Sequence, residues 1–224
     1  MNALLIGCGS KFGLKIMKVL LNRDWKVNSI SGSDLNFKHE NLNQLAIDWK
    51  SFNVTDIEKF LKALPSLDIV FFNQNGSSLS QGDFQRKFDT LDLWKLESDW
   101  STSYTNSCIL PFHIIKTLGD RCNSTTRVAW MLSSMIYNHS DLMCGYADYY
   151  GNKYQNYVMM KNFSHNHEAC FFGINPGSIE AHVDKTPEDL MQRILLWETE
   201  SLDGTVRNMD FTENKRFEIF NDQS

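Results

Sequence analysis

The sequence lacks the features that would assign it to a membrane, a nucleic acid or a hydrolase. No apolar run reaches the roughly 18 residues that a membrane-spanning helix needs, so we expect no membrane partner. Acidic residues outnumber basic ones by 27 to 22, for a net charge of −5. With no basic excess to neutralise a phosphate backbone, we expect no nucleic-acid partner. Ser133 and Ser134 do not lie in a Gly-x-Ser-x-Gly sequence, which argues against a nucleophile-elbow hydrolase.

Cysteine is sparse and shows no metal spacing. The five cysteines are scattered, without a Cys-x-x-Cys pair, which predicts reduced thiols in a cytoplasmic protein. His165 and His167 form a His-x-His sequence, but a catalytic zinc needs three protein ligands in a defined array, so we expect no metal. The start of the chain has neither the basic nor the apolar region of a signal peptide, so no targeting segment is expected.

What the chain does have is a regular alternation of predicted strands and helices. No linker rich in Pro, Gly or Ser divides its 224 residues, and a hydrophobic content of 42% suits one core. The predicted strands are 3–6, 25–30, 44–47, 67–72, 127–132 and 169–174. The predicted helices are 12–20, 55–63, 100–118, 148–163 and 187–197. This order predicts a single doubly wound α/β domain over residues 1–224, with a parallel sheet covered on both faces.

Two predicted helices carry specific signals. The sequence from Thr55 to Glu58 matches a capping box, which predicts Thr55 as the N-cap of helix 55–63. Pro111 lies inside helix 100–118, where proline removes a backbone donor, so a kink or break is expected there. One face of that helix is predicted to carry Tyr104, Cys108, Ile115 and Leu118.

A glycine-rich turn separates the first strand from the first helix. Gly7, Gly9 and Gly13 permit positive φ and let backbone N–H groups approach a pyrophosphate at the positive end of a helix. The spacing is Gly-x-Gly-x3-Gly, and Lys11 and Phe12 stand where a further glycine would be expected. A glycine-rich turn that binds no nucleotide remains the alternative.

Two Tyr-x3-Lys pairs lie in the predicted helix 148–163, Tyr149 with Lys153 and Tyr157 with Lys161. Residues four apart share one helix face. A lysine ammonium near a tyrosine hydroxyl lowers its pKa from about 10 toward neutrality, so the tyrosine can act as a general acid or base. For a pair taken alone, an exposed helix face that carries an aromatic and a cation is the better explanation.

The order of the pieces resembles the short-chain dehydrogenase/reductase family over nearly the whole chain. This resemblance implies a Rossmann-type domain with a mostly parallel sheet of seven strands, and a nicotinamide cofactor. The catalytic set that it implies is Asn106, Ser134, Tyr149 and Lys153. The cofactor contacts that it implies are Gly7, Ser10, Lys11, Phe12, Gly13, Ser31, Asp48, Asn73, Asn75, Gly76, Pro176 and Gly177, together with Tyr149 and Lys153.

Spacing favours the first Tyr-x3-Lys pair. Tyr149 follows Ser134 by 15 residues, slightly more than the family's usual gap, whereas Tyr157 follows it by 23. Tyr149 also stands at the helix start, from which a side chain can reach the strand ends. Segments 145–149 and 202–211 resemble small carbonyl reductases of the sniffer and C-factor type.

The implied reaction transfers a hydride between the nicotinamide and a small carbonyl or alcohol substrate. By resemblance, Tyr149 donates the proton to the substrate oxygen, Ser134 hydrogen-bonds that oxygen, and Asn106 holds a water that links Lys153 to solvent. Four residues depart from the family pattern: Lys11, Ser31, Asn75 and Ala181. They leave open an alternative, a nucleotide-binding sensor or interaction protein with little or no turnover.

Cofactor choice and assembly are two further expectations. Ser31 ends the second strand where an acid would select NAD, and with Lys11 it favours NADP, while Asp34 is the competing determinant. In the family, helices like 100–118 and 148–163 commonly pair with a second subunit. Here they carry Trp100, Phe112, Tyr154, Tyr157 and Met160, so we expect a homodimer or homotetramer.

Overall fold

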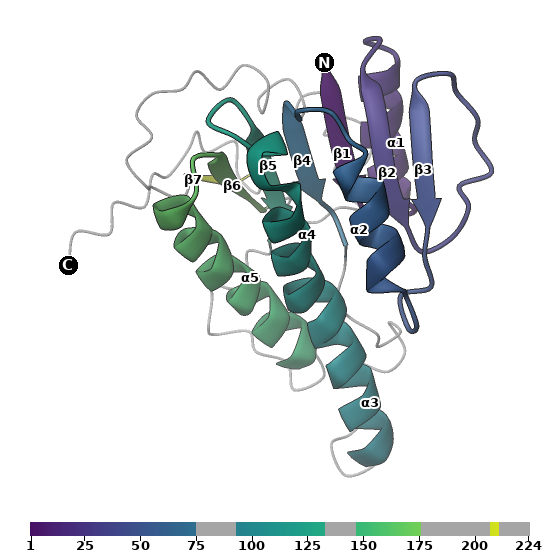
Figure 1. The fold of residues 1–224 in the computed structure, drawn as a ribbon. Coiled ribbons are helices and arrows are strands. Elements are labelled where there is room, and N and C mark those ends of the chain that lie inside the picture. The colour runs from purple at the N-terminus through teal and green to yellow at the C-terminus, as the bar shows by residue number, and fades with distance from the viewer. Residues whose placement is uncertain (75–92, 133–146, 176–206, 211–224) are drawn as a thin grey trace.

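A computed structural model describes residues 1–74, 93–132, 147–175 and 207–210, and shows one parallel sheet of seven strands (Figure 1). The strands are β1 (Asn2–Ile6), β2 (Lys26–Ser31), β3 (Leu42–Ala46), β4 (Ile69–Phe72), β5 (Arg127–Met131), β6 (Cys170–Asn175) and β7 (Arg207–Asp210). Their order is β3-β2-β1-β4-β5-β6-β7, and every pairing is parallel. The predicted doubly wound α/β sheet is therefore confirmed, and its described part is parallel throughout.

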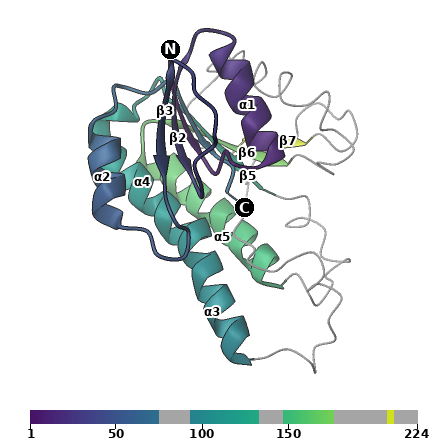
Figure 2. The ribbon, with the colours of Figure 1, turned by 90° about the vertical axis from the view of Figure 1, so that its right-hand side faces the viewer.

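Helices cover both faces of the sheet. They are α1 (Lys11–Leu21), α2 (Val54–Lys62), α3 (Leu93–Tyr104), α4 (Leu110–Leu118) and α5 (Ala147–Asn166). In Figure 2, α1 lies on one side of the sheet, and α2, α4 and α5 lie on the other. Each face buries its own apolar core, because successive strand residues point to opposite faces: Leu4 and Ile6 pack toward α2 and α4, and Ala3 and Leu5 toward α1.

The predicted strands and helices match the observed ones with shifts at their ends. Helix α3 begins at Leu93, before the predicted start at residue 100, and β4 begins at Ile69, after the predicted start at residue 67. Strand β7 was not expected from the hydrophobic pattern of the chain. The predicted helix 187–197 lies outside the described residues.

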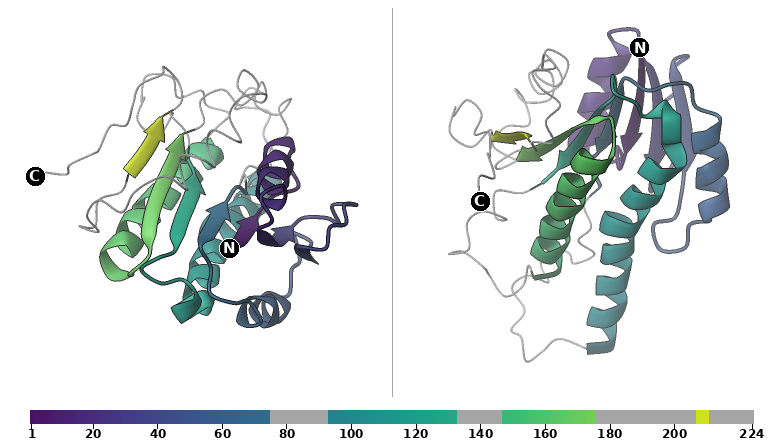
Figure 3. Two further views of the ribbon diagram at one scale, coloured as in Figure 1. Left: turned by 90° about the horizontal axis from the view of Figure 1, so that it is seen from above. Right: turned by 60° about the vertical axis from the view of Figure 1, so that its left-hand side comes forward.

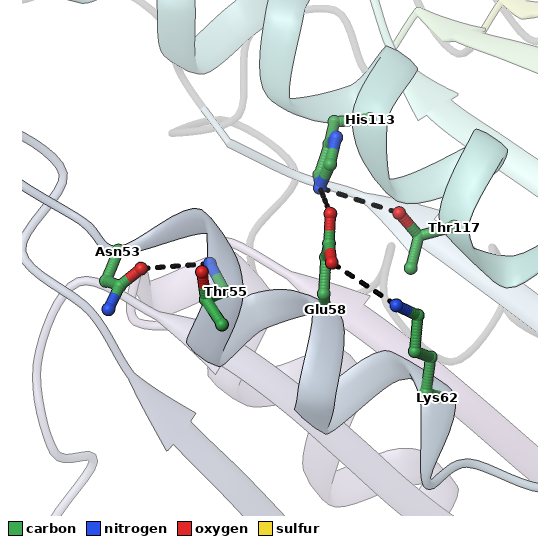
Figure 4. A network of polar contacts seen from close by, with 6 residues as sticks. All are labelled: Asn53, Thr55, Glu58, Lys62, His113 and Thr117. Carbon is green, nitrogen blue, oxygen red and sulfur yellow. Dashed lines mark hydrogen bonds and ion pairs between the residues drawn. The ribbon is translucent and has the colours of Figure 1, made fainter.

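The N-cap predicted for α2 was wrong. Asn53, and not Thr55, caps the helix, because the Asn53 side-chain oxygen accepts a hydrogen bond of 2.9 Å from the Thr55 amide (Figure 4). Asn53 has extended backbone angles and asparagine is a strong N-cap, so helical geometry already begins at Val54. Further along α2, Glu58 contacts Lys62 of the same helix at 3.3 Å and His113 of α4 at 3.4 Å (Figure 4). The contact with His113 joins α2 to α4.

Pro111 is accommodated by a change of hydrogen-bond pattern. Between α3 and α4 the residues Thr105–Ile109 form a π-turn, in which the Leu110 amide donates to the Thr105 carbonyl five residues back. Pro111 then falls in the first turn of α4, where no backbone donor is required. The extra residue rotates α3 relative to α4, so Tyr104 is 40% exposed while Cys108, Ile115 and Leu118 are buried. The prediction that Tyr104 shares their face was wrong.

Candidate functional site

The glycine turn follows β1 and is tightly built. Gly7 has φ +77°, and a Cβ there would lie 2.6 Å from the Gln74 amide nitrogen. A Cβ on Gly13 would lie 2.6 Å from the Cys8 α-carbon. The nearest atom to a Cβ on Gly9 would be 3.8 Å away, an ordinary contact. The turn therefore requires glycine at 7 and 13 but not at 9.

Side chains hold this turn at the N-terminus of α1. Ser10 is the N-cap, and its hydroxyl oxygen accepts from the Gly13 amide at 3.0 Å. The Asn73 side-chain amide donates to the Gly7 carbonyl at 3.0 Å and to the Ser10 hydroxyl at 2.9 Å. Asn73 therefore ties the end of β4 to the glycine turn.

The start of α1 offers unused donors. The amides of Lys11 and Phe12 have no acceptor among the described residues, and no acidic residue lies in the first turn of this fully described helix. Lys11 is exposed, whereas the Phe12 side chain is buried in the core. Phe12 can thus offer only its backbone to a cofactor. Two amides that have no acceptor in the described part of the chain, at the start of a helix whose first turn carries no acidic residue, fit a phosphate group.

Gln74 links the glycine turn to the π-turn. The Gln74 side-chain amide donates to the Asn106 main-chain carbonyl at 3.2 Å, and the Asn106 side-chain amide donates to the Trp49 carbonyl at 3.0 Å. Gln74 and Asn106 are both buried, each with 8% of its surface exposed. Among the described residues, no donor reaches the side-chain oxygens of Gln74 and Asn106, although both atoms are buried. The pair therefore keeps two acceptors available.

Lys153 lies at the carboxyl end of β5. It projects from α5, is 4% exposed, and its ammonium donates to the Met131 carbonyl at 2.7 Å. Burial lowers the pKa of Lys153 to about 8, and the neighbouring Cys108 thiol opposes this change. Burial also raises the pKa of Cys108 to about 11. At neutral pH the site thus holds an ammonium ion next to a neutral thiol.

A polar seam joins α5 to α3 and the π-turn. The Asn152 amide donates to the Ser103 hydroxyl, and the Cys108 thiol lies 3.8 Å from the Asn156 side-chain oxygen. We use the name polar seam for the buried residues Ser103, Asn106, Ser107, Cys108, Asn152, Lys153 and Asn156. Helix α5 therefore turns polar residues inward, beside the end of β5.

The structure distinguishes the two Tyr-x3-Lys pairs by their lysines. Tyr149 is the third residue of α5, one turn before Lys153. In the other pair, the Lys161 ammonium lies 5.6 Å from the centre of the Tyr157 ring, over its face. Tyr157 packs half-buried against the core. Of these two lysines, Lys153 is the one bound at a strand end.

Three polar residues near β2 and β3 already have local partners. The buried Ser31 hydroxyl donates to the Ser33 carbonyl at 2.7 Å, so it cannot donate to a phosphate without losing that bond. Asp48 accepts from the Lys50 amide at 3.0 Å and from the Ser51 hydroxyl at 2.7 Å, which lowers the pKa of its carboxyl. Asp34 accepts from the Asn36 amide at 3.0 Å. The Ser31 donor role expected from the sequence is thus not available in this conformation.

The remaining predicted site residues lie outside the described part of the chain: Ser134, Asn75, Gly76, Pro176 and Gly177.

Sequence reasoning missed Gln74 and Trp49. Gln74 stands inside the Asn-Gln-Asn-Gly segment, where the departure from the family pattern was its signal, and Trp49 is an aromatic residue directly after Asp48. Within residues that the structure describes, no cluster of three or more His, Cys, Asp or Glu could hold a metal, and no helix is long and apolar enough to cross a membrane.

The fold and this site define a Rossmann-type α/β chain with a glycine turn at its first helix. No protein-family model and no curated protein matches the sequence. Many solved structures match the fold. The chain has the fold of the short-chain dehydrogenases/reductases, as three of these structures illustrate.

Serine dehydrogenase from Escherichia coli is 19% identical, over 94% of this chain and 96% of that one, with a TM-score of 0.66. A carbonyl reductase from Pseudomonas aeruginosa PAO1 is 17% identical, over 87% and 90%, with a TM-score of 0.67. A short chain dehydrogenase from Burkholderia cenocepacia J2315, in complex with NADP, is 14% identical, over 87% and 82%, with a TM-score of 0.65.

Proposed function

We propose that the protein is an NAD(P)-dependent oxidoreductase of the short-chain dehydrogenase/reductase family, acting on a small carbonyl or alcohol. The observation that carries this proposal is the buried Lys153 ammonium at the carboxyl end of β5, one helical turn after Tyr149. The π-turn with Asn106 packs against the same helix. Parallel strands bring their carboxyl ends to one edge of a sheet, so Lys153 and the glycine turn share that edge.

The start of α1 supports a nicotinamide dinucleotide as the cofactor. The turn from Gly7 to Gly13 and the free amides of Lys11 and Phe12 would hold its pyrophosphate. When bound, the nicotinamide supplies or takes up the hydride. Two structural neighbours were crystallised with NADP. We propose NADP over NAD. The exposed Lys11 would supply the positive charge near the 2′-phosphate, because the Ser31 hydroxyl already donates to the Ser33 carbonyl.

The chain's own residues would move the proton. In carbonyl reduction, the Tyr149 hydroxyl donates its proton to the substrate oxygen, and in alcohol oxidation the phenolate takes it back. The positive charge of the Lys153 ammonium would favour the phenolate form of Tyr149. By family resemblance, Ser134 hydrogen-bonds the substrate oxygen and Asn106 holds a water. The buried, unpartnered side-chain oxygen of Asn106 supports such a water.

Reduced-cofactor consumption tests this proposal. The protein is mixed with NADPH or NADH and a panel of aldehydes, ketones and quinones, and the loss of absorbance of the reduced cofactor is followed. We expect saturable turnover with at least one class of carbonyl, faster with NADPH. No binding of either cofactor by calorimetry would overturn the proposal.

A second candidate is a nucleotide sensor without turnover. Two observations favour it. Lys11 replaces a glycine of the family's turn, and the Asn106 main-chain carbonyl already accepts a hydrogen bond from the Gln74 side-chain amide. Saturable binding of NADPH together with no turnover on the whole panel would favour the sensor over the enzyme. The resemblance to small carbonyl reductases of the sniffer and C-factor type stays a prediction.

We also propose a homo-oligomer built on α5 and on the continuous run of α3, the π-turn and α4 beside it (Figure 3). These elements expose large apolar side chains by 40–54%: Trp100, Tyr104, Ile109, Phe112, Tyr154 and Val158. Met160 was expected at this surface but is fully buried in the core, because it faces the sheet. The four described cysteines form no disulfide. A cytoplasmic location stays a prediction.

A further inference from the structure

Gln74 lies at the edge of the sheet that also holds Lys153. Strand β4 ends at Phe72, which pairs with Trp130 of β5, and Gln74 is the second residue after Phe72. Met131, whose carbonyl accepts from the Lys153 ammonium, directly follows Trp130. Gln74 and the residue that anchors Lys153 therefore stand at the carboxyl ends of neighbouring strands.

The main chain at Gln74 is fastened to the glycine turn. The Asn73 amide donates to the Ile6 carbonyl at 2.9 Å, and the Asn73 side chain donates to the Gly7 carbonyl and the Ser10 hydroxyl. A Cβ on Gly7 would lie 2.6 Å from the Gln74 nitrogen and 2.7 Å from its α-carbon, so the two backbones are in close contact. A displacement of the turn would therefore move Gln74 as well.

Pro111 and the π-turn together deprive the Asn106 carbonyl of its two helical donors. In an α-helix this carbonyl would accept from the Leu110 amide, but in the π-turn that amide donates to the Thr105 carbonyl. The donor of the π pattern would be residue 111, a proline with no N–H. The Gln74 side-chain amide supplies the missing donor through its bond of 3.2 Å to the Asn106 carbonyl. A residue distant in the chain thus completes the turn that accommodates Pro111.

The π-turn continues from Asn106 to the backbone beside Lys153. Two residues further on, the Cys108 thiol lies 3.8 Å from the Asn156 side-chain oxygen and 4.0 Å from the Asn152 carbonyl. Asn152 directly precedes Lys153 in α5, and the residues of this contact are buried. Because a closely packed interior transmits displacements, a shift of the π-turn would move α5 at the lysine.

We infer that Gln74 is a positioning residue that transmits cofactor binding from the glycine turn to the π-turn and so to Lys153. The inference rests on the proposed function, in which the amides of Lys11 and Phe12 hold the pyrophosphate of the cofactor. A phosphate bound there restrains the turn, and Gln74 joins that turn to the Asn106 carbonyl through one side chain. The order gained at the first site is thus passed to the second, which couples the two sites.

The experiment is hydrogen exchange followed by mass spectrometry, with and without saturating NADP⁺. In the wild type, NADP⁺ should slow amide exchange about fivefold or more in peptides that cover the glycine turn and in peptides that cover the π-turn, the lower end of common coupling between sites. In Gln74→Met, which has a side chain of similar length without an amide, the slowing should remain at the glycine turn. At the π-turn it should fall below about twofold. Gln44→Met, at a half-buried position on β3, is the matched control and should behave as the wild type does.

The ratio of the exchange rates with and without NADP⁺ separates transmission from a merely structural role. If Gln74 only stabilised the fold, Gln74→Met would speed exchange at the π-turn in the free and the bound protein alike, and the ratio would keep its wild-type value. That result overturns the inference. A wild type in which NADP⁺ slows exchange at the glycine turn alone overturns it too.

Gln74→Asn is the second variant, because it keeps the amide but is shorter by a methylene group and cannot reach the Asn106 carbonyl. It should lose the slowing at the π-turn in the same way, and it carries the test if circular dichroism shows that Gln74→Met does not fold. If NADP⁺ slows exchange at neither turn of the wild type, the proposed cofactor site is overturned together with the inference. That outcome is distinct from a loss of transmission with the glycine turn still protected.

Discussion

The Lys153 ammonium and the Met131 main-chain carbonyl are joined by a hydrogen bond of 2.7 Å, which fastens α5 to the carboxyl end of β5. This bond places a buried positive charge at the edge of the sheet where ligands of doubly wound folds bind. Burial disfavours the charged form of the side chain and lowers the pKa of Lys153 to about 8. The same residue therefore links the stability of the fold to its proposed chemistry.

Lys153→Met should change the pH dependence of stability. In the wild type the unfolded chain, with a lysine pKa of about 10.4, binds more protons than the folded chain between pH 8 and 10. The free energy of unfolding contributed by Lys153 therefore rises with pH, by up to about 3 kcal/mol over this window. Urea unfolding at several pH values should show that the free energy of unfolding of the wild type rises with pH relative to that of Lys153→Met.

Lys116→Met, at an exposed position, serves as the control and should follow the pH profile of the wild type. Burial raises the pKa of the thiols of Cys8, Cys108 and Cys122, which titrate with the opposite sign. Their contribution largely cancels in the difference between variant and wild type. Parallel pH profiles for wild type and Lys153→Met would show that the ammonium is not buried as described.

Gln74→Ala should destabilise the fold. The change removes the bond to the Asn106 carbonyl and leaves a buried gap between the glycine turn and the π-turn. A lost buried hydrogen bond of this kind costs about 1–3 kcal/mol of unfolding free energy. Gln44→Ala is the comparison, because the half-buried Gln44 makes long contacts of 3.4–3.5 Å. Similar urea midpoints for the two variants would contradict the linking role of Gln74.

Gly7→Ala and Gly9→Ala separate the two glycines of the turn. At position 7 the backbone has φ +77° and a Cβ would press on the Gln74 amide, so we expect a loss of about 2 kcal/mol or more. At position 9 a Cβ meets an ordinary contact, so the change should stay within about 0.5 kcal/mol. Thermal unfolding measures both. A Gly9→Ala protein as unstable as Gly7→Ala would refute the described geometry.

Tyr154→Glu should weaken self-association. Tyr154 is 54% exposed on α5, and a carboxylate there would be desolvated in the proposed interface. Light scattering at micromolar concentration should show a dimer or tetramer for the wild type and a smaller species for Tyr154→Glu. Val54→Glu, at an exposed apolar position on α2, is the control and should leave the mass unchanged. A monomeric wild type would end this part of the proposal.

The alternation of strands and helices could be predicted from the sequence because each apolar run is short and ends at a polar or glycine residue. The glycine turn was also predictable, since its local geometry needs glycine. The π-turn was not, because the response of a helix to Pro111 depends on the hydrogen bonds that its neighbours can supply. Likewise, Asn53 and Thr55 are both competent caps, and only the position at which helical geometry begins decides between them.

The links through Gln74 and Trp49 could not be predicted for a related reason. Each joins residues far apart in the chain, so no local pattern records them. Lys153 shows the opposite case. Its spacing from Tyr149 suggested a role, and the structure places the ammonium at a strand end. The matching spacing of Tyr157 and Lys161 instead places the Lys161 ammonium over the Tyr157 ring.

The most direct test of the account is the turnover of Tyr149→Phe on a carbonyl that the wild type reduces, with Tyr157→Phe as the matched control. Loss of the proton donor should lower kcat by about 100-fold or more, the scale of general acid catalysis. Affinity for NADPH, measured by calorimetry, should stay within about twofold of the wild type, because the change removes one hydroxyl and leaves the other proposed cofactor contacts in place. For scale, a loss of about 1.4 kcal/mol would already lower the affinity tenfold. Tyr157→Phe should retain wild-type turnover. A Tyr149→Phe protein with near wild-type kcat would contradict the central claim.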